Sequence, residues 1–197
     1  RRAPADALVG ASLRTLPDGA TVATGSVRRR AQLARVRPDL QFVELRGNID
    51  TRLSKIPEGG AIVMAVAALQ ILGLTDHIDE ELDIEAFVPA VGQGCVAVEG
   101  RADDADTAAV LAAIDHAATR RAVEIERAFL AELGSGCSLP VGAHARHGVL
   151  HTFLADLDTG RTVADQVPLR GDAAGRPTAV DLEAARSAAR ASHAALV

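Results

Sequence analysis

Short apolar segments alternate with helical stretches through the first half of the chain, and this alternation limits the folds open to it. The expected elements are a strand over 21–23, a helix over 27–36, a strand over 41–45, a short helix near 50–56, a strand over 61–66 and a helix that Gly73 ends. Ser26 is a suitable N-cap for the first helix, and Pro38 stops it. Strands and helices at this spacing predict a mostly parallel sheet covered by helices.

The pattern changes after residue 88. Pro89, Gly92 and Gly94 indicate a hinge or a backbone segment close to a ligand, and Cys95 to Val98 resembles one more strand. The elements expected next are helices over 104–115 and 119–133, strands over 141–145, 149–155 and 161–169, and a final helix over about 178–195. Three strands joined by short turns predict an antiparallel meander within an α+β unit.

Composition excludes several classes of function. The net charge of −5 and the absence of Trp and Tyr disfavour nucleic-acid binding. No apolar run reaches the ~18–20 residues that cross a bilayer, and no signal peptide is visible, so we expect a soluble, cytoplasmic protein without membrane partners. Two cysteines suffice for neither a disulfide framework nor a metal site. The chain starts without Met and reads like the middle of a longer sequence, so we expect a fragment.

Two candidate anion sites lie in the basic region between Arg28 and Lys55, which holds eight basic and three acidic residues. The first is the start of the helix after Ser26, where free backbone N–H groups and two arginines would attract anions. An ordinary capped helix with a solvated basic face is an equally good interpretation. Arg30, Arg35 and Arg37 belong to such a solvated face.

The second candidate is the end of the next strand, because ligands of α/β sheets bind beyond the carboxyl ends of strands. Arg46 and Gly47 follow that strand, and Arg52 lies further on, in the next helix. A surface salt bridge, with Asp50 available as a partner, is the alternative. Two anion-type sites at successive strand ends modestly favour ligand binding.

Cys137 lies in a loop of small residues that follows a long helical pattern. Such a loop can expose a thiol, although a lone cysteine is more often a small buried hydrophobe. Cys95 lies within an apolar strand pattern and is expected in the core. The histidines show no reliable metal-ligand spacing. His144 and His147 form a possible metal pair, but the adjacent Gly148 favours a loop edge.

Four motifs together resemble porphobilinogen deaminase (hydroxymethylbilane synthase). They are Thr24–Arg29, Leu45–Leu53, Pro89–Gly94 and Gly136–Gly142, and they occur in the family's order over most of the chain. The resemblance implies a transferase of porphyrin and tetrapyrrole (haem) biosynthesis. It condenses four porphobilinogen molecules head to tail, with loss of ammonia, on a dipyrromethane cofactor that a thioether links to Cys137, and hydrolysis releases hydroxymethylbilane. Porphobilinogen and linear oligopyrroles are the implied partners, and a full-length member is expected to be a monomer.

The resemblance also assigns roles to individual residues. It places the carboxylates of cofactor and substrate on Arg28, Arg29, Arg46 and Arg52, with further contacts from Thr24, Gly25, Ser26 and Gly47, and it places Gly92, Gln93 and Gly94 at the hinge beside the cofactor. It implies no metal. No acidic residue of this chain occupies the motif of the family's catalytic aspartate, so the chain alone is expected to be inactive. Ile71 stands where the family usually has an arginine, which leaves one carboxylate contact in doubt.

The expected fold class is therefore α/β: a sheet domain like those of periplasmic binding proteins, followed by a small α+β domain with a three-stranded antiparallel sheet and helices. Residues 1–88 would form domain two, residues 89–112 the hinge and a segment returning to a missing domain one, and residues 113–197 domain three. The first alternative is a non-catalytic anion-binding module of the periplasmic-receptor type, which would need no thiol at position 137. The second, an arginine-rich RNA-binding protein, conflicts with the acidic net charge.

Overall fold

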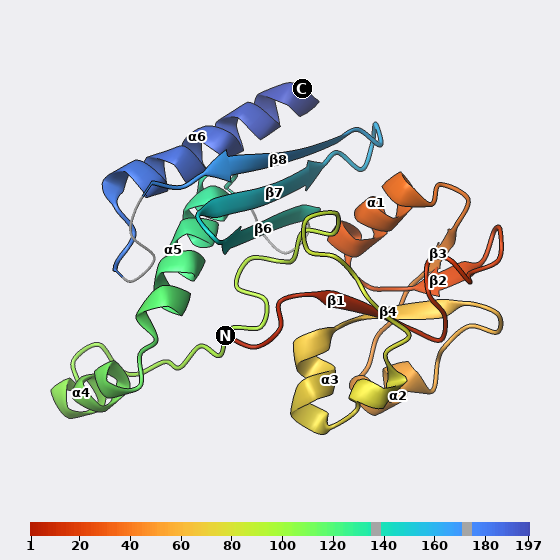
Figure 1. The fold of residues 1–197 in the computed structure, drawn as a ribbon, viewed down its shortest axis with the longest axis horizontal. Coiled ribbons are helices and arrows are strands. Elements are labelled where there is room, and N and C mark those ends of the chain that lie inside the picture. The colour runs from red at the N-terminus through yellow and green to blue at the C-terminus, as the bar shows by residue number, and fades with distance from the viewer. Residues whose placement is uncertain (135–138, 171–174) are drawn as a thin grey trace.

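A computed structural model describes residues 1–134, 139–170 and 175–197. The chain forms two lobes, each built around its own sheet (Figure 1). The first lobe contains, in chain order, β1 (Asp6–Val9), β2 (Thr21–Ala23), α1 (Val27–Val36), β3 (Gln41–Val43), α2 (Ile49–Leu53), β4 (Ala61–Ala65), α3 (Val66–Leu72), the 3-10 helix η1 (Thr75–His77) and β5 (Glu80–Glu81). The remaining elements are α4 (Ala105–Ala113), α5 (Ala117–Glu132), β6 (Val141–Arg146), β7 (Val149–Ala155), β8 (Thr162–Pro168) and α6 (Ala179–Leu196).

The sheet of the first lobe is mixed, with the strand order β3-β2-β4-β1-β5. β2 runs parallel to β3 and β4, as expected, whereas β1 runs antiparallel to both β4 and β5. The expectation of a mostly parallel sheet was wrong because it omitted β1 and β5. Both strands are short, and β5 consists of two glutamates that give no apolar pattern.

Alternating side chains of the central strands build two apolar layers. Leu8 and Val63 face the layer that includes Leu33 of α1. Ile62 and Met64, in contrast, pack in the opposite layer, which includes residues of α3. Helices therefore cover both faces of the sheet, and the N-terminus of α1 is held beyond the end of β2 (Figure 1).

The capping residues predicted from the sequence mark the observed ends of two helices in this lobe. Ser26 caps α1 by accepting a hydrogen bond from the amide of Arg29. Gly73 ends α3 in the left-handed conformation, with φ of 69°, where a side chain would be strained. Of the three arginines expected on the solvated face of α1, Arg30 and Arg35 are exposed. Arg37 is half-buried instead, because it binds Asp39 and the carbonyl group of Leu13.

The second lobe is the predicted antiparallel meander, with the order β6-β7-β8. One face of this sheet packs on α5 and α6 through a core that includes Ile125, Phe129 and Ala185. The other face meets the first lobe, where Phe153 and Ala155 pack with Val88 and with Ala31 of α1. The two lobes therefore share a small apolar contact.

Residues 95–98 do not form the predicted strand, because no strand among the described residues lies beside them to complete a ladder. Val96 and Val98 are 72% and 58% exposed, and Val110 of α4 and Ile114 after it are similarly exposed. α4 projects away from both lobes (Figure 1). This part of the chain leaves apolar side chains open to solvent.

Candidate functional site

A small cleft of about 370 Å³ opens where α1 begins and where the chain leaves β3. Its wall consists of Gly25, Ser26, Arg29, Glu44, Leu45, Arg46, Arg52 and Val63. The two predicted anion sites are therefore one site. β2 and β3 are parallel neighbours, so the segments that follow them reach the same edge of the sheet.

The arginines after β3 are exposed to the cleft in different ways. The side chain of Arg46 is 88% exposed and lies 3.3 Å from Glu44, a surface pair that holds it only weakly. Arg52 donates its Nε–H to the carbonyl of Gly47 at 2.9 Å, and no described carboxylate pairs with it. The alternative of a surface salt bridge therefore applies to Arg46, with Glu44 rather than Asp50 as its partner. Gly47 has φ of 125°, and a Cβ there would meet Thr51 at 2.7 Å. Glycine is thus required at this turn.

The arginines of α1 lie deeper, around the carboxylate of Asp6 in β1. Arg29 lines the cleft and donates Nε–H and Nη2–H to one oxygen of Asp6, at 3.0 and 2.7 Å. Arg28 is buried beside it and donates to the other oxygen at 2.7 Å and to the carbonyl of Val88 at 2.7 Å. Thr24 is also buried and accepts from the amide of Ser26 at 3.2 Å. Thr24 and Arg28 thus support the cleft from below.

The charges around Asp6 decide its protonation state. Burial alone would raise its pKa, but the neighbouring guanidiniums of Arg29 and Arg28 outweigh burial and hold the pKa below its ordinary value. Burial lowers the pKa of Arg28, which nevertheless stays protonated because arginine normally titrates far above neutral pH. The cluster therefore keeps two positive charges and one negative charge.

The predicted hinge residues connect this cluster to the second lobe. Gln93 donates to Asp6 at 2.9 Å and to the carbonyl of Pro4 at 2.5 Å. The amide of Gly92 donates to Glu126 of α5 at 2.7 Å. Gly94 has φ of 80°, and a Cβ there would lie 2.6 Å from the carbonyl oxygen of Arg2. Residues 92–94 are thus held from both sides.

Glu126 is the corresponding buried carboxylate of the second lobe. It accepts from both Nη atoms of Arg1, at 2.6 and 3.0 Å, and from the amides of Gly92 and Ala145. His144 Nδ1 lies 3.2 Å from the nearer oxygen of Glu126. Of the two histidines expected at a loop edge, His147 lies in the turn after β6, with φ of 49°, whereas His144 is buried within β6.

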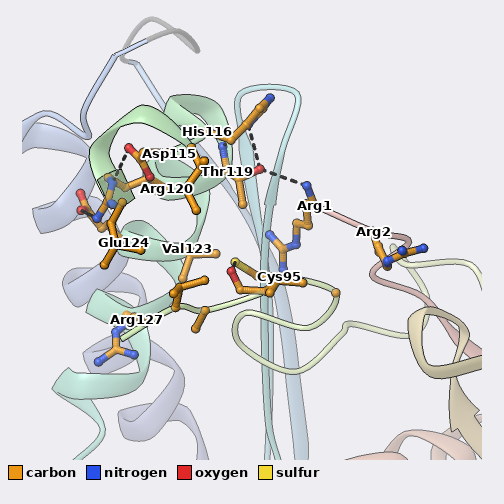
Figure 2. A pocket seen from close by; sticks show the side chains of 16 residues that line it. Arg1, Arg2, Cys95, Asp115, His116, Thr119, Arg120, Val123, Glu124 and Arg127 are labelled. Atoms are coloured by element: carbon orange, nitrogen blue, oxygen red, sulfur yellow. Dashed lines mark hydrogen bonds and ion pairs between the residues drawn. The ribbon is translucent and has the colours of Figure 1, made fainter. Parts of the chain in front are cut away.

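A second, larger cleft of about 710 Å³ separates residues 94–98 from α5 (Figure 2). Arg1, Val123 and Arg127 are among the residues that line it, and Thr119 lies between His116 and the terminal amine of Arg1. Cys95 is half-buried in its wall, and its Sγ lies 3.7 Å from the carbonyl of Val96. The prediction of Cys95 as a core residue was therefore wrong, because the segment that carries it is not part of a sheet.

Cys137 lies outside the described residues, so its predicted role stays a prediction. Ile71 is 58% exposed on α3 and does not line the smaller cleft.

Within the described ranges, no group of three or more His, Cys, Asp and Glu side chains could hold a metal ion. The same ranges contain no helix with both the length and the hydropathy needed to cross a bilayer.

Sequence reasoning missed Asp6 and Glu126. Each lies within an otherwise ordinary strand or helix pattern, and its arginine partners are distant in sequence. The only available signal was the buried position that each takes in its pattern: Asp6 opens an apolar strand, and Glu126 follows Ile125 on the apolar side of α5.

We predict that Glu126→Gln lowers the free energy of unfolding by about 3 kcal/mol at neutral pH, since it breaks a buried ion pair. Burial alone would raise the pKa of Glu126, but His144, Arg1 and the amide of Ala145 hold it below the ordinary 4.5. A lowered folded-state pKa stabilises the protein above pH 4.5, and this contribution is lost as the pH falls through the folded-state value. The deficit of the variant should therefore shrink in acid.

Urea titrations at neutral and acidic pH measure this deficit. Glu124→Gln is the matched control on the same helix, because Glu124 makes only a half-exposed contact of 3.8 Å with Arg120. It should change stability by less than about 0.5 kcal/mol. Equal effects of the two substitutions at neutral pH would contradict the prediction.

Comparison with known proteins matches two family models. The model described as "Porphobilinogen deaminase, dipyromethane cofactor binding domain" matches residues 1–109, and the one described as "Porphobilinogen deaminase, C-terminal domain" matches residues 120–186. The boundary between them falls near α4, which in chain order follows the first sheet and precedes the second.

Curated relatives carry the same name. The porphobilinogen deaminase of Roseiflexus sp. (strain RS-1) is 53% identical over 151 residues, which is 74% of this chain and 50% of that protein. That of Desulforudis audaxviator (strain MP104C) is 45% identical over 175 residues, 84% of this chain and 57% of its own length. This chain thus spans about half the length of the relatives it matches. Since a family model covers more than half of its residues, the chain belongs to the porphobilinogen deaminase family.

Proposed function

We propose that this chain carries the cofactor cradle and the cofactor attachment loop of a hydroxymethylbilane synthase. The observation that carries the proposal is the convergence of Arg29, Arg46, Arg52 and the α1 N-terminus on one cleft, in the region that matches the family's cofactor-binding model. Three guanidiniums face this cleft against the single carboxylate of Glu44. The cleft is therefore electropositive.

The residues present fit a dipyrromethane cofactor. Each pyrrole of the cofactor and of the growing chain carries two carboxylates, and guanidinium groups bind carboxylates through paired hydrogen bonds. Ser26 and the amide groups near Gly25 add donors at a helix N-terminus, where the helix dipole also favours anions. Cys137 would attach the cofactor. When bound, the cofactor supplies the primer to which porphobilinogen units are added.

Each residue has a distinct task in this proposal. Arg29, Arg46 and Arg52 neutralise and orient the carboxylates, while Arg28 and Thr24 support them from below. Gly47 keeps the turn before α2 tight, so that Arg46 and Arg52 stay on one side of the cleft. Gly92, Gln93 and Gly94 link the cradle to the lobe that carries Cys137.

We further propose the division into domain two (1–88), a hinge with a connecting segment (89–112) and domain three (113–197). The exposure of Val96, Val98, Val110 and Ile114 supports the role of the connecting segment. We infer that these side chains pack against the half of the family fold that this chain does not span. The catalytic aspartate belongs to that half, by resemblance.

Covalent attachment can be tested by intact mass. Protein from a host that makes porphobilinogen should be heavier than its sequence by one dipyrrole, and Cys137→Ser should remove that excess. Cys95→Ser is the matched control, because Cys95 lies in the other cleft, and it should keep the excess. An adduct that survives in Cys137→Ser, or an unmodified wild-type protein, would contradict the attachment.

The cradle can be tested by binding. Arg52→Gln should weaken the binding of porphobilinogen about tenfold, because it removes a charged hydrogen-bond partner of a carboxylate. Arg101→Gln, at an exposed arginine near Asp103 and outside the cleft, should leave binding unchanged. Calorimetric titration measures both, and equal affinities for the two variants would count against the cradle.

The chain alone should form no hydroxymethylbilane from porphobilinogen, since the family's catalytic aspartate is not among its residues. The measurement is the rate of product formation at matched molar concentrations of this chain and of the relative from Roseiflexus sp. Turnover by the chain at a rate comparable to that of the relative would refute this prediction.

A further inference from the structure

Asp6 is the most completely enclosed charged group beside the cleft. Its side chain has 0% exposure, and both of its carboxylate oxygens are used. One oxygen accepts from Arg28, and the other accepts from Arg29 and from Gln93. Among the described residues that line the cleft, Asp6 is not included. Its effects must therefore act through its partners.

The first partner, Arg29, is held in one orientation. Two of its nitrogens bind Asp6, and Nη1 donates to the carbonyl of Val63 at 3.2 Å. A guanidinium has five N–H donors in a fixed fork. Three donors therefore go to protein groups, and the remaining two are available to an anion in the cleft.

The second partner, Arg28, carries a charge that the cleft does not contact directly. It is 4% exposed, and its donors bind Asp6, the carbonyl of Val88 and, at 3.3 Å, the side chain of Gln93. With two guanidiniums sharing one carboxylate, the cluster keeps an excess positive charge in a poorly solvated place. An anion beside Arg29 would offset this excess.

We propose that Asp6 is a positioning residue of the cradle: it aims Arg29 into the cleft and keeps Arg28 beneath it, while Gln93 ties the same carboxylate to the hinge. This inference rests on the proposed function for the identity of the anion. The arrangement of the arginines can be tested without that identity.

The hinge contact gives Asp6 a second consequence. Gln93 binds Asp6 through its side chain, and the adjacent Gly92 binds Glu126 of α5 through its amide. Adjacent residues of one short segment therefore bind the carboxylate that orients Arg29 and the buried carboxylate of the second lobe.

The first experiment measures arginine reactivity in Asp6→Asn. In the wild-type chain, phenylglyoxal followed by peptide mass analysis should modify Arg46 and Arg52 quickly and Arg28 and Arg29 slowly. Asp6→Asn should raise the modification rates of Arg28 and Arg29 about tenfold, because an amide cannot hold two guanidiniums. The rates of Arg46 and Arg52 should stay unchanged.

The matched control is Asp39→Asn. Asp39 accepts two bonds from Arg37 and one from the amide of Gly19, so the change breaks a similar carboxylate–guanidinium pair in the same lobe, outside the cleft. It should alter stability but leave Arg28 and Arg29 protected. Equal reactivity of Arg28 and Arg29 in wild type and Asp6→Asn would overturn the proposal.

The second experiment measures porphobilinogen binding by calorimetry. Asp6→Asn should bind about tenfold more weakly than wild type, and Asp39→Asn should bind equally well. Wild-type affinity in folded Asp6→Asn overturns the positioning role. If wild type itself binds no porphobilinogen, the proposed ligand is wrong, and arginine reactivity alone decides the role of Asp6.

If Asp6→Asn does not fold, the same reactivity measurement is made on Gln93→Leu. It removes one of the four hydrogen bonds to Asp6 and leaves the ion pairs in place. Reactivity of Arg28 and Arg29 should rise by a smaller factor, about threefold by the same reasoning. Unchanged reactivity in a folded Gln93→Leu variant would then overturn the proposal.

Discussion

Burial of two carboxylates constrains the whole junction between the lobes. A buried charge is tolerated only when ion pairs and hydrogen bonds compensate for its lost hydration. Asp6 meets this demand with Arg28, Arg29 and Gln93, and Glu126 meets it with Arg1 and two backbone amides. Gln93 and Gly92 are adjacent, so the two networks share one short segment of backbone. This segment is thus a place where electrostatic demands from both lobes are satisfied together.

Local signals predicted most elements because their boundaries are set by neighbouring residues. Ser26 and Gly73 fixed the ends of two helices, and the glycines at the turns of the second sheet separated its strands. β1 and the antiparallel part of the first sheet were missed, since a four-residue strand with a charged first residue has no distinctive pattern. For residues 95–98 the error was the opposite one, because a strand was predicted where none forms. The segment has the alternation of a strand, but a strand forms only beside a hydrogen-bonding partner.

The candidate site was likewise predictable in part. The cleft was predictable because parallel neighbouring strands end at one edge, which brought Ser26 and Arg46 together. The depth of each arginine was not predictable. Arg28 and Arg29 are adjacent in sequence, yet one supports the cleft and the other lines it, and both bind Asp6, a partner more than twenty residues away. Pairing between distant charges leaves no local pattern in a single sequence.

The contacts of the first six residues have a consequence for the order of assembly during synthesis. Arg1 binds Gln93 and Glu126, which lie 92 and 125 residues further along the chain, and Arg2 donates its amide to Gly94. Contacts of such high sequence separation form slowly, because a long loop must close first. Arg1 and Arg2 are synthesised before Gln93, Gly94 and Glu126, and they reach their final place only after these partners have emerged. Until α5 has emerged, Arg1 lacks its carboxylate partner Glu126, so this contact between the two lobes forms only after α5 has been translated.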